Sequence, residues 1–380
     1  MERIRILASI LCACFVSVAW GQQPACTGCN NWTEFHRPNM HRWNPYEDVL
    51  NVNNVGSLSL KWIHTTGSWV YSSPAVVGGT VYVGSGDGNL YALNATTGAK
   101  LWRYTTGNSV FSSPSVVNGV VYFGSQDYNV YALNAKTGAL VWSYQTGHWV
   151  SSSPTVVNGV VYVASGDGNV YALKVSDGAL LWSYTTGFYM DSSPANSPTV
   201  ANGVVYISNG TDGLIYALNA SIGTPLWSYD TGFFTQSSPA VANGVVYVGS
   251  NDGHVSALNA TTGAVLWSYS AGSVISSPAV AYGVVYYGAS DNNVHALDAS
   301  TGAKLWSHAI GAYVNSSPAV ANGVVYVGSY DHNIYALNAK TGSKLWKYAT
   351  GNMVESSPVV VNGVVYVGSD DYNVYAFGLP

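Results

Sequence analysis

The sequence predicts an all-β protein, an eight-bladed β-propeller of four-stranded antiparallel blades, and three observations lead to this fold. First, a tryptophan recurs at intervals of 40, 40, 40, 45, 40, 39 and 40 residues, a regularity typical of repeat proteins. Second, each repeat holds four short runs rich in Val, Tyr and Leu, without a helical period. Third, the repeat region begins with a fourth run and ends without one, as a closed ring requires. The tryptophans are Trp62, Trp102, Trp142, Trp182, Trp227, Trp267, Trp306 and Trp346.

The second repeat shows how one blade follows from its residues. Its runs SVV, VVYFGS, VYALN and ALVW, between Ser115 and Trp142, have the β-branched and aromatic composition of strands. Asn118-Gly119 stands between the first two runs, and this dipeptide is a strong signal for a two-residue hairpin. A turn containing Asp127 and a Thr137-Gly138 turn separate the remaining runs. Three tight turns in about 40 residues predict a four-stranded meander, which is one propeller blade.

The two ends of the repeat region complement each other. The segment Leu58–Trp62 matches the fourth run of a repeat but precedes any first run, and the last repeat stops at Phe377 before a tryptophan. The N-terminal segment is therefore predicted to be the fourth strand of the last blade, which leaves no open end. A count of the proline that opens each first strand also gives eight blades: Pro74, Pro114, Pro154, Pro194, Pro239, Pro278, Pro318 and Pro358.

Three regions are predicted along the chain: a signal peptide at 1–21, an irregular leader at 22–57 and the propeller at 58–380. A short basic start, an apolar stretch too short to span a bilayer and the small-residue pattern Ala19-Trp20-Gly21 indicate export. We therefore expect a periplasmic, outer-membrane-associated or secreted protein without a transmembrane segment. A lipid anchor on Cys14 is an alternative, although this cysteine lies inside the apolar stretch.

Cys26 and Cys29 are the two cysteines that remain after cleavage. Their C-x-x-C spacing in an exported chain favours a local disulfide. His36 and His41 follow them, so a zinc site is a weaker alternative, because the gap between the two pairs is far shorter than a zinc finger needs.

The composition argues against a nucleic-acid partner. Only 8% of the residues are charged, the formal net charge is −5, and no basic stripe is present. The surface is therefore expected to be wetted by Ser, Thr, Asn and Tyr, and we expect a monomer.

The run Ala92–Trp102 has the pattern A-x-N/D-x-x-T-G-x-x-x-W, which recurs in full at Ala132–Trp142, Ala257–Trp267, Ala296–Trp306 and Ala336–Trp346. This pattern resembles the tryptophan-docking motif of the pyrroloquinoline quinone (PQQ) repeat family, the quinoprotein-like β-propellers. The resemblance supports the propeller fold and a structural role for the eight tryptophans as contacts between blades. The fourth and fifth repeats depart from the pattern at Asp177-Gly178 and Ile222-Gly223-Thr224-Pro225.

The family includes quinone-dependent dehydrogenases and cofactor-free propellers, among them the scaffold lipoprotein of the outer-membrane barrel assembly machinery, and the chain is more similar to the cofactor-free members. The dehydrogenases imply a vicinal cysteine pair, a calcium held by Glu, Asn and Asp, and an aspartate base. No cysteine follows Cys29 and Glu355 is the only glutamate of the propeller, so no catalytic, cofactor-binding or metal-binding residue carries over.

We therefore expect a non-enzymatic, exported binding or scaffold module for a protein or glycan partner in the cell envelope. The alternative is a PQQ- and calcium-dependent alcohol or sugar dehydrogenase with an atypical site.

Positions at which the repeats differ point to a candidate binding site. The residue before each Ser-Ser-Pro and the residue two places earlier vary, whereas the residue between them is nearly always valine. A period of two places both variable positions on one side of the innermost strand, toward the channel. The predicted funnel suits a sugar or a planar ring, unless its side chains simply fill the channel. It consists of Trp69, Tyr71, Phe111, His148, Trp149, Tyr189, Asp191, Phe234, Gln236, Tyr313, Asn315 and Glu355.

The two carboxylates of this predicted funnel, Asp191 and Glu355, belong to the fourth and eighth repeats. These repeats are opposite in an eight-bladed ring, whereas paired acid and base catalysis on one bond needs carboxyl groups within about 5–10 Å. The spacing therefore argues against a glycosidase-like mechanism.

Overall fold

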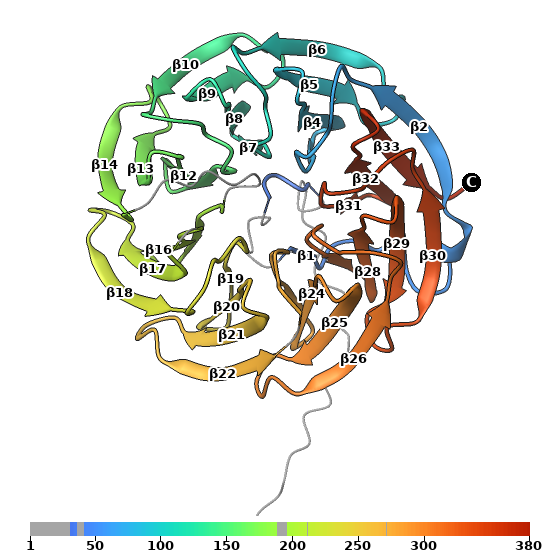
Figure 1. Ribbon diagram of the computed structural model, residues 1–380. Helices are drawn as coiled ribbons and strands as arrows, with labels where there is room; N and C mark the ends of the chain where they lie inside the picture. Colours follow the sequence, from blue (N-terminus) through green and yellow to red (C-terminus); the bar gives the residue numbers. More distant parts are fainter. Residues whose placement is uncertain (1–30, 36–41, 188–195, 211, 271) are drawn as a thin grey trace, which may run out of the picture.

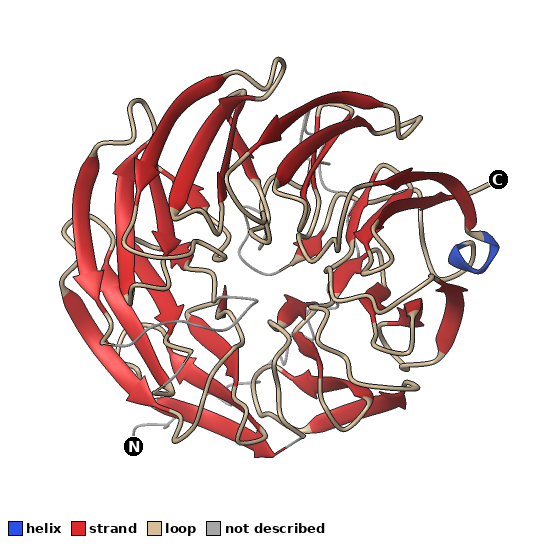
Figure 2. Cartoon of the chain, turned by 45° about the horizontal axis from the view of Figure 1, so that its top comes forward, coloured by secondary structure: helices blue, strands red, loops and turns tan. Residues whose placement is uncertain are grey.

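The computed structural model describes residues 31–35, 42–187, 196–210, 212–270 and 272–380 of the 380-residue chain. Eight antiparallel four-stranded blades surround a central channel, as Figures 1 and 2 show from two directions. The first strand of each blade lies nearest the channel and the fourth lies at the outer rim. The predicted all-β, eight-bladed fold is confirmed, and the one helix among the described residues is the short 3₁₀ turn η1, Val55–Ser57.

The strands follow one another in chain order, from the channel outward in each blade. Blade 1 consists of β3 (Ala75–Val77), β4 (Thr80–Gly84), β5 (Asn89–Asn94) and β6 (Lys100–Thr105), and blade 2 of β7 (Ser115–Val117), β8 (Val120–Gly124), β9 (Asn129–Asn134) and β10 (Leu140–Gln145). Blade 3 consists of β11 (Thr155–Val157), β12 (Val160–Ala164), β13 (Asn169–Lys174) and β14 (Leu180–Thr185), and blade 4 of β15 (Thr199–Ala201), β16 (Val204–Ser208), β17 (Leu214–Asn219) and β18 (Pro225–Asp230).

Blades 5 to 8 repeat this arrangement. Blade 5 consists of β19 (Ala240–Ala242), β20 (Val245–Gly249), β21 (His254–Asn259) and β22 (Val265–Ser270), and blade 6 of β23 (Ala279–Ala281), β24 (Val284–Gly288), β25 (Asn293–Asp298) and β26 (Lys304–Ala309). Blade 7 consists of β27 (Ala319–Ala321), β28 (Val324–Gly328), β29 (Asn333–Asn338) and β30 (Lys344–Ala349), and blade 8 of β31 (Val359–Val361), β32 (Val364–Gly368), β33 (Asn373–Gly378) and β2 (Ser59–Thr65).

The last blade is completed by the N-terminal strand β2. This strand pairs antiparallel with β33, and Trp62 stands opposite Ala376. The blue strand β2 lies against the red strand β33 in Figure 1. The predicted closure by an N-terminal strand is therefore confirmed.

The hairpins adopt the backbone that their residues favour. Asn118 and Gly119, between β7 and β8, have φ of 50° and 77°. A two-residue type I′ turn requires positive φ at both positions, and Asn and Gly tolerate it best. The turn between the second and third strands contains the repeated aspartate. In blade 1 this is Asp87, whose Oδ1 accepts a hydrogen bond from the amide of Asn89 at 3.0 Å and whose Oδ2 accepts one from the amide of Gly67 at 2.8 Å. The repeated aspartate therefore both shapes its turn and ties the blade to the connection that precedes it.

Each repeated tryptophan joins its blade to the next one. The indole Nε1 donates to a main-chain carbonyl, and in every case except Trp346 the ring also covers the glycine of the turn before the fourth strand, so that a Cβ on Gly98 would lie 2.7 Å from the Trp62 ring. The carbonyl acceptors lie 2.9 to 3.0 Å away: Ala95 for Trp62, Ala135 for Trp102, Val175 for Trp142, Ala220 for Trp182, Ala260 for Trp227, Ala299 for Trp267, Ala339 for Trp306 and Leu58 for Trp346.

The nearly constant valine before the Ser-Ser-Pro segments packs between blades. Val110 and Val70 have no exposed surface. A Cβ on Gly84 would lie 2.4 Å from the carbonyl oxygen of Val110, and one on Gly368 would lie 2.3 Å from Val70. The glycine that ends the second strand therefore leaves room for the valine of the following blade, and the last such contact joins blade 8 to blade 1.

The segment before β2 lies across the inner strands on one side of the ring. Trp32 exchanges two main-chain hydrogen bonds with Val76 in blade 1, and the carbonyl of Thr33 accepts the amide of Val116 in blade 2. Further along, β1 (Trp43–Asn44) pairs in parallel with β27 of blade 7. We call residues 31–35 and 42–57 the strap.

The predicted start of the innermost strand in the fourth blade is wrong. The sequence contains two candidates, Ser192-Ser193-Pro194 and Asn196-Ser197-Pro198, and the prediction used the first one. In the structure, Pro198 directly precedes β15, and Ser197 takes the place of the second serine of the other repeats. The fourth repeat therefore carries four extra residues before its innermost strand.

Several predictions concern residues outside the described part of the chain. The signal peptide at 1–21, Cys14, the Cys26 and Cys29 pair, and His36 and His41 all lie there. Within the described ranges, no helix combines the length and the apolar run that a membrane crossing requires.

Candidate functional site

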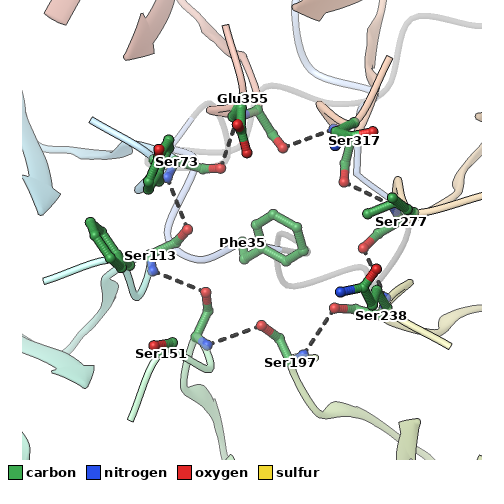
Figure 3. Close-up of a pocket in the computed structure, with 16 residues that line it drawn as sticks. Phe35, Ser73, Ser113, Ser151, Ser197, Ser238, Ser277, Ser317 and Glu355 are labelled. Atoms are coloured by element: carbon green, nitrogen blue, oxygen red, sulfur yellow. Dashed lines mark hydrogen bonds between the residues drawn. The ribbon is translucent and has the colours of Figure 1, made fainter. Parts of the chain in front are cut away.

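A ring of eight hydrogen bonds surrounds the channel at the level of the Ser-Ser-Pro segments. The amide of the second serine in each blade donates to the hydroxyl of its counterpart in the next blade, at 2.8 to 3.0 Å, and the eighth returns to the first (Figure 3). The serine ring consists of Ser73, Ser113, Ser153, Ser197, Ser238, Ser277, Ser317 and Ser357.

The first serine of each pair has a different partner. The hydroxyl of Ser72 accepts the amide of Gly84 at 3.0 Å, and Ser316 and Ser356 accept equivalent glycine amides in blades 7 and 8. These serines are fully buried, so the bonds satisfy amides that no strand partner reaches. The Ser-Ser-Pro segment therefore fixes the inner wall both within and between blades.

A cavity of about 60 Å³ lies at the serine ring. Phe35 of the strap stands at the centre of the ring in Figure 3. The guanidinium of Arg42 lies 4.6 Å from the Phe35 ring and donates to the carbonyls of Pro318 and Pro358 at 2.9 and 3.1 Å. Since Arg42 has no exposed surface, the strap is anchored firmly behind the cavity.

The structure brings five of the predicted funnel residues together on the cavity wall. They are Tyr71, Phe111, Gln236, Asn315 and Glu355, with Ser151 and Ile275 at the corresponding positions of blades 3 and 6. They lie in the connections that lead into the innermost strands, not in the strands as predicted, because regular pairing begins only after the proline.

The other predicted residues that the structure describes do not line this cavity. Trp69, Phe234 and Tyr313 are 44%, 46% and 50% exposed and lie two residues before the cavity residues, so they form a rim. His148 packs against Trp149 at 4.9 Å between ring centres. Tyr189 and Asp191 lie outside the described residues.

Sequence reasoning missed a second set of variable residues beside the cavity. They occupy the position between serine and aspartate in the turn after the second strand, as in Ser369-Asp370-Asp371. The amide at this position donates to the carbonyl of the rim residue in the same repeat, as Tyr330 does to Tyr313 at 3.0 Å. The variation at this position among the repeats could have identified these residues from the sequence. The set includes Gln126, which donates to Ser151, Asn251, which donates to Gln236, Tyr330 and Asp370.

Blades 7 and 8 form an acidic sector. The amide of Asn315 donates to the hydroxyl of Tyr330 at 2.7 Å, and that hydroxyl also interacts with the carboxylate of Glu355. Asp370 is only 2% exposed, and burial together with the charge of Glu355 raises its pKa to about 7. Burial likewise raises the pKa of Glu355, which the bond from Tyr330 lowers in part.

Blades 1 and 2 form an aromatic sector beside this acidic one. Tyr71 lies 4.9 Å from Phe111 and 5.9 Å from Trp69 between ring centres. Burial, and then the charges of Asp370 and Glu355, raise the pKa of the Tyr71 hydroxyl to about 12. The two sectors therefore meet at Tyr71.

The repeats match the sequence profile of the outer membrane protein assembly factor BamB over residues 51–211, 190–317 and 290–378. The chain belongs to this PQQ-repeat family. A comparison with curated protein sequences gives no significant match, so the relationship rests on the repeat profile and the fold.

Solved structures share the propeller of this BamB-like chain at low sequence identity. BamB from Moraxella catarrhalis is 21% identical with a TM-score of 0.75, over 84% of this chain and 99% of that one. Quinohemoprotein alcohol dehydrogenase ADHIIG from Pseudomonas putida HK5 is 18% identical with a TM-score of 0.78, over 93% and 81%. The designed protein Ika8 is 18% identical with a TM-score of 0.74, over 83% and 98%. At these identities the similarity establishes the fold alone.

The cavity does not fit the quinone and calcium that the dehydrogenases of the family imply. PQQ is a tricarboxylic acid, and within the described ranges no Lys or Arg lines the cavity, whose charged residue is Glu355. Among the described residues no group of three His, Cys, Asp or Glu side chains could hold a metal. A cofactor with several negative charges would lie beside like charges in a partly buried site, which is unfavourable.

Proposed function

We propose that the protein is a non-enzymatic binding module of the cell envelope, periplasmic or outer-membrane-associated, that presents the open mouth of its channel to a protein partner. Membership in the BamB family supports a scaffold role. Family membership alone does not indicate which surface binds the partner, because every propeller has two faces and an outer edge.

The observation that carries the proposal is the asymmetry of the channel. Behind the serine ring, Phe35 and the buried Arg42 occupy the axis, and the strap covers the inner strands of blades 1, 2 and 7. In front of the ring, Trp69, Phe234 and Tyr313 are about half exposed. Exposed aromatic side chains around a concave site are typical of binding surfaces.

The aromatic rim is also compatible with a glycan, the second candidate. Aromatic faces with nearby amides, as at Gln236 and Asn251, can stack on sugar rings and bond to hydroxyl groups. The protein partner remains the first choice because the matching family is that of an outer membrane protein assembly factor, and the glycan is treated as an outcome of the test.

Site-specific photo-crosslinking in the native cell envelope tests the proposal. A benzophenone amino acid would replace Tyr313 on the rim, and in the matched control it would replace Ser183, which is exposed on outer strand β14. We expect a discrete protein adduct from position 313 and none from position 183. An adduct from position 183 alone would contradict the proposed surface.

Two further measurements separate the remaining functions. A glycan array should give no specific signal, and a signal lost in Trp69→Ala or Trp149→Ala would make the protein a lectin. Dye reduction with alcohols or aldoses in the presence of added PQQ and calcium should not exceed the background rate, and turnover that depends on both additions would replace the binding module with an oxidoreductase.

A further inference from the structure

Asp370 is a buried carboxylate without a partner in the described part of the chain. It is 2% exposed, and neither carboxylate oxygen has a hydrogen-bond partner there. Its position is fixed, since its amide donates to the carbonyl of Met353 at 2.9 Å. Buried polar groups in folded proteins are nearly always hydrogen-bonded, and an unpaired buried charge is costly. The charge of Glu355, which lines the cavity, acts on Asp370, so the unpaired carboxylate points to a group that enters there and completes it.

The surroundings of Asp370 define the chemistry of that group. Glu355 lines the cavity and raises the pKa of Asp370, and both charges act on the hydroxyls of Tyr71 and Tyr330. Of the residues that the structure describes, none with a basic side chain lines the cavity. Two carboxyl groups without a basic partner favour a cationic ligand.

The neighbouring aromatic sector favours an organic cation over a bare metal ion. Tyr71, Phe111 and Trp69 form a continuous set of ring contacts next to the carboxyl groups. An alkyl chain with a terminal ammonium can lie on such rings while its charge reaches the acids, and ammonium groups are attracted to aromatic faces. A metal ion would leave the aromatic side chains unused, and among the described residues no group of three His, Cys, Asp or Glu side chains could hold one.

We propose that the sector formed by Glu355, Asp370 and Tyr71 is a binding site for a primary ammonium group on an alkyl chain, as in a lysine side chain of a protein partner. The inference rests on the proposed function and names the part of the partner that enters the channel mouth. The ammonium is the hydrogen-bond partner that Asp370 lacks, and it also bonds to Glu355, while the alkyl chain packs on Tyr71 and Phe111.

Binding should depend on pH in a defined direction. Glu355, Asp371, Tyr71 and Tyr330 are the titratable groups that act on or surround Asp370. Burial and the nearby negative charges raise the pKa of Asp370 to about 7, so much of this carboxyl group is protonated below neutral pH. The cation pairs with the ionised form, so its affinity should increase between pH 6 and pH 8 with release of protons.

The experiment uses n-butylammonium chloride as the probe and the uncharged n-butanol as its matched ligand, with binding to the full chain measured by ligand-observed NMR and calorimetry. We expect saturable binding of n-butylammonium alone, at least about tenfold tighter at pH 8 than at pH 6. Asp370→Asn and Glu355→Gln should each weaken it by about tenfold or more. Asp48→Asn, which removes an exposed charge in the strap, should leave it unchanged.

Thermal unfolding of each variant checks that the fold is intact, and removal of a buried charge should not lower the midpoint. Equal affinity of wild type and Asp370→Asn would overturn the assignment, as would binding of n-butanol as tight as that of n-butylammonium. Binding of calcium, but not n-butylammonium, with loss in Glu355→Gln would make the site a metal site instead. A rim adduct that persists in Asp370→Asn and Glu355→Gln would retain the proposed function while rejecting this ligand.

Discussion

The amide of Ser357 donates a hydrogen bond to the hydroxyl of Ser73 at 3.0 Å, although 284 residues separate the two. This bond closes the serine ring between the last blade and the first. The same junction is held further out by the contact of Gly368 with Val70 and by the pairing of β33 with β2. The ring is therefore closed at three distances from its axis.

Ser73→Ala should destabilise the protein because it leaves the buried amide of Ser357 without an acceptor. The loss of a partner for a buried donor costs about 1–3 kcal/mol. Chemical denaturation should therefore show a lower free energy of unfolding by about this amount. Ser113→Ala removes the acceptor of the Ser73 amide, a bond of the same ring between blades 1 and 2. Ser143→Ala removes a serine hydroxyl from an exposed position of β10 and is the control. We expect similar losses at 73 and 113 and almost none at 143, so a neutral Ser73→Ala would show that the closing bond does not contribute.

Gly138→Ala and Gly119→Ala separate steric contact from backbone conformation in one blade. Both glycines have positive φ, 71° and 77°, but a Cβ on Gly138 would lie 2.7 Å from the Trp102 ring, whereas a Cβ on Gly119 would have no described neighbour within 4 Å. Each change costs about 1 kcal/mol for the left-handed backbone. Gly138→Ala should cost at least about 1–3 kcal/mol more because it displaces the indole. Equal losses in thermal or urea unfolding would mean that the tryptophan contact is not tight.

The blades could be predicted because each strand and turn depends on residues near it in the sequence. Asn118-Gly119 fixes a hairpin locally, and the unpaired run at Leu58–Trp62 can only complete a blade that lacks a fourth strand. The register of blade four could not be chosen from the sequence, since Ser193 and Ser197 precede prolines alike. Only the bonds of Ser197 to both neighbouring blades decide it.

The candidate site was predicted in part, for a similar reason. Variation before Ser-Ser-Pro located Tyr71, Asn315 and Glu355, because the repeat itself indicates which side faces the channel. Asp370 was missed, since the second variable position lies in a turn whose direction has no simple period. The role of Phe35 and Arg42 could not be inferred either, because the strap does not repeat.

Glu34→Gln should change how stability depends on pH. Glu34 is 3% exposed, and burial raises the pKa of its carboxyl group to about 7 against an ordinary value of 4.5, while bonds from the amide of Val156 and the hydroxyl of Ser115 lower it in part. Between these two values the folded protein holds a proton that the unfolded chain has lost. The free energy of unfolding should therefore fall as pH rises from about 4.5 to 7, by up to about 3 kcal/mol from this group.

The Glu34→Gln variant has no ionisable proton at this position and keeps a carbonyl acceptor for Val156 and Ser115. The wild type should therefore lose more stability than the variant between pH 5 and pH 8 in urea unfolding. Glu47 and Asp370 contribute equally to both proteins, so the difference isolates Glu34. Parallel pH profiles would mean that Glu34 ionises in the folded protein as it does in the unfolded chain.

Arg42→Lys should loosen the strap although it keeps the positive charge. The guanidinium donates to the carbonyls of Phe35, Pro318 and Pro358, which come from the strap and from blades 7 and 8. An ammonium group lacks the planar fork that reaches several acceptors at fixed angles, so at least one buried carbonyl should lose its donor. We expect a loss of about 1–3 kcal/mol in the free energy of unfolding and faster proteolysis of the strap. Arg103→Lys, on the exposed face of β6, is the matched control and should change neither quantity. If Arg42→Lys behaved like Arg103→Lys, the strap would be held by its main-chain pairing with the inner strands, not by the guanidinium.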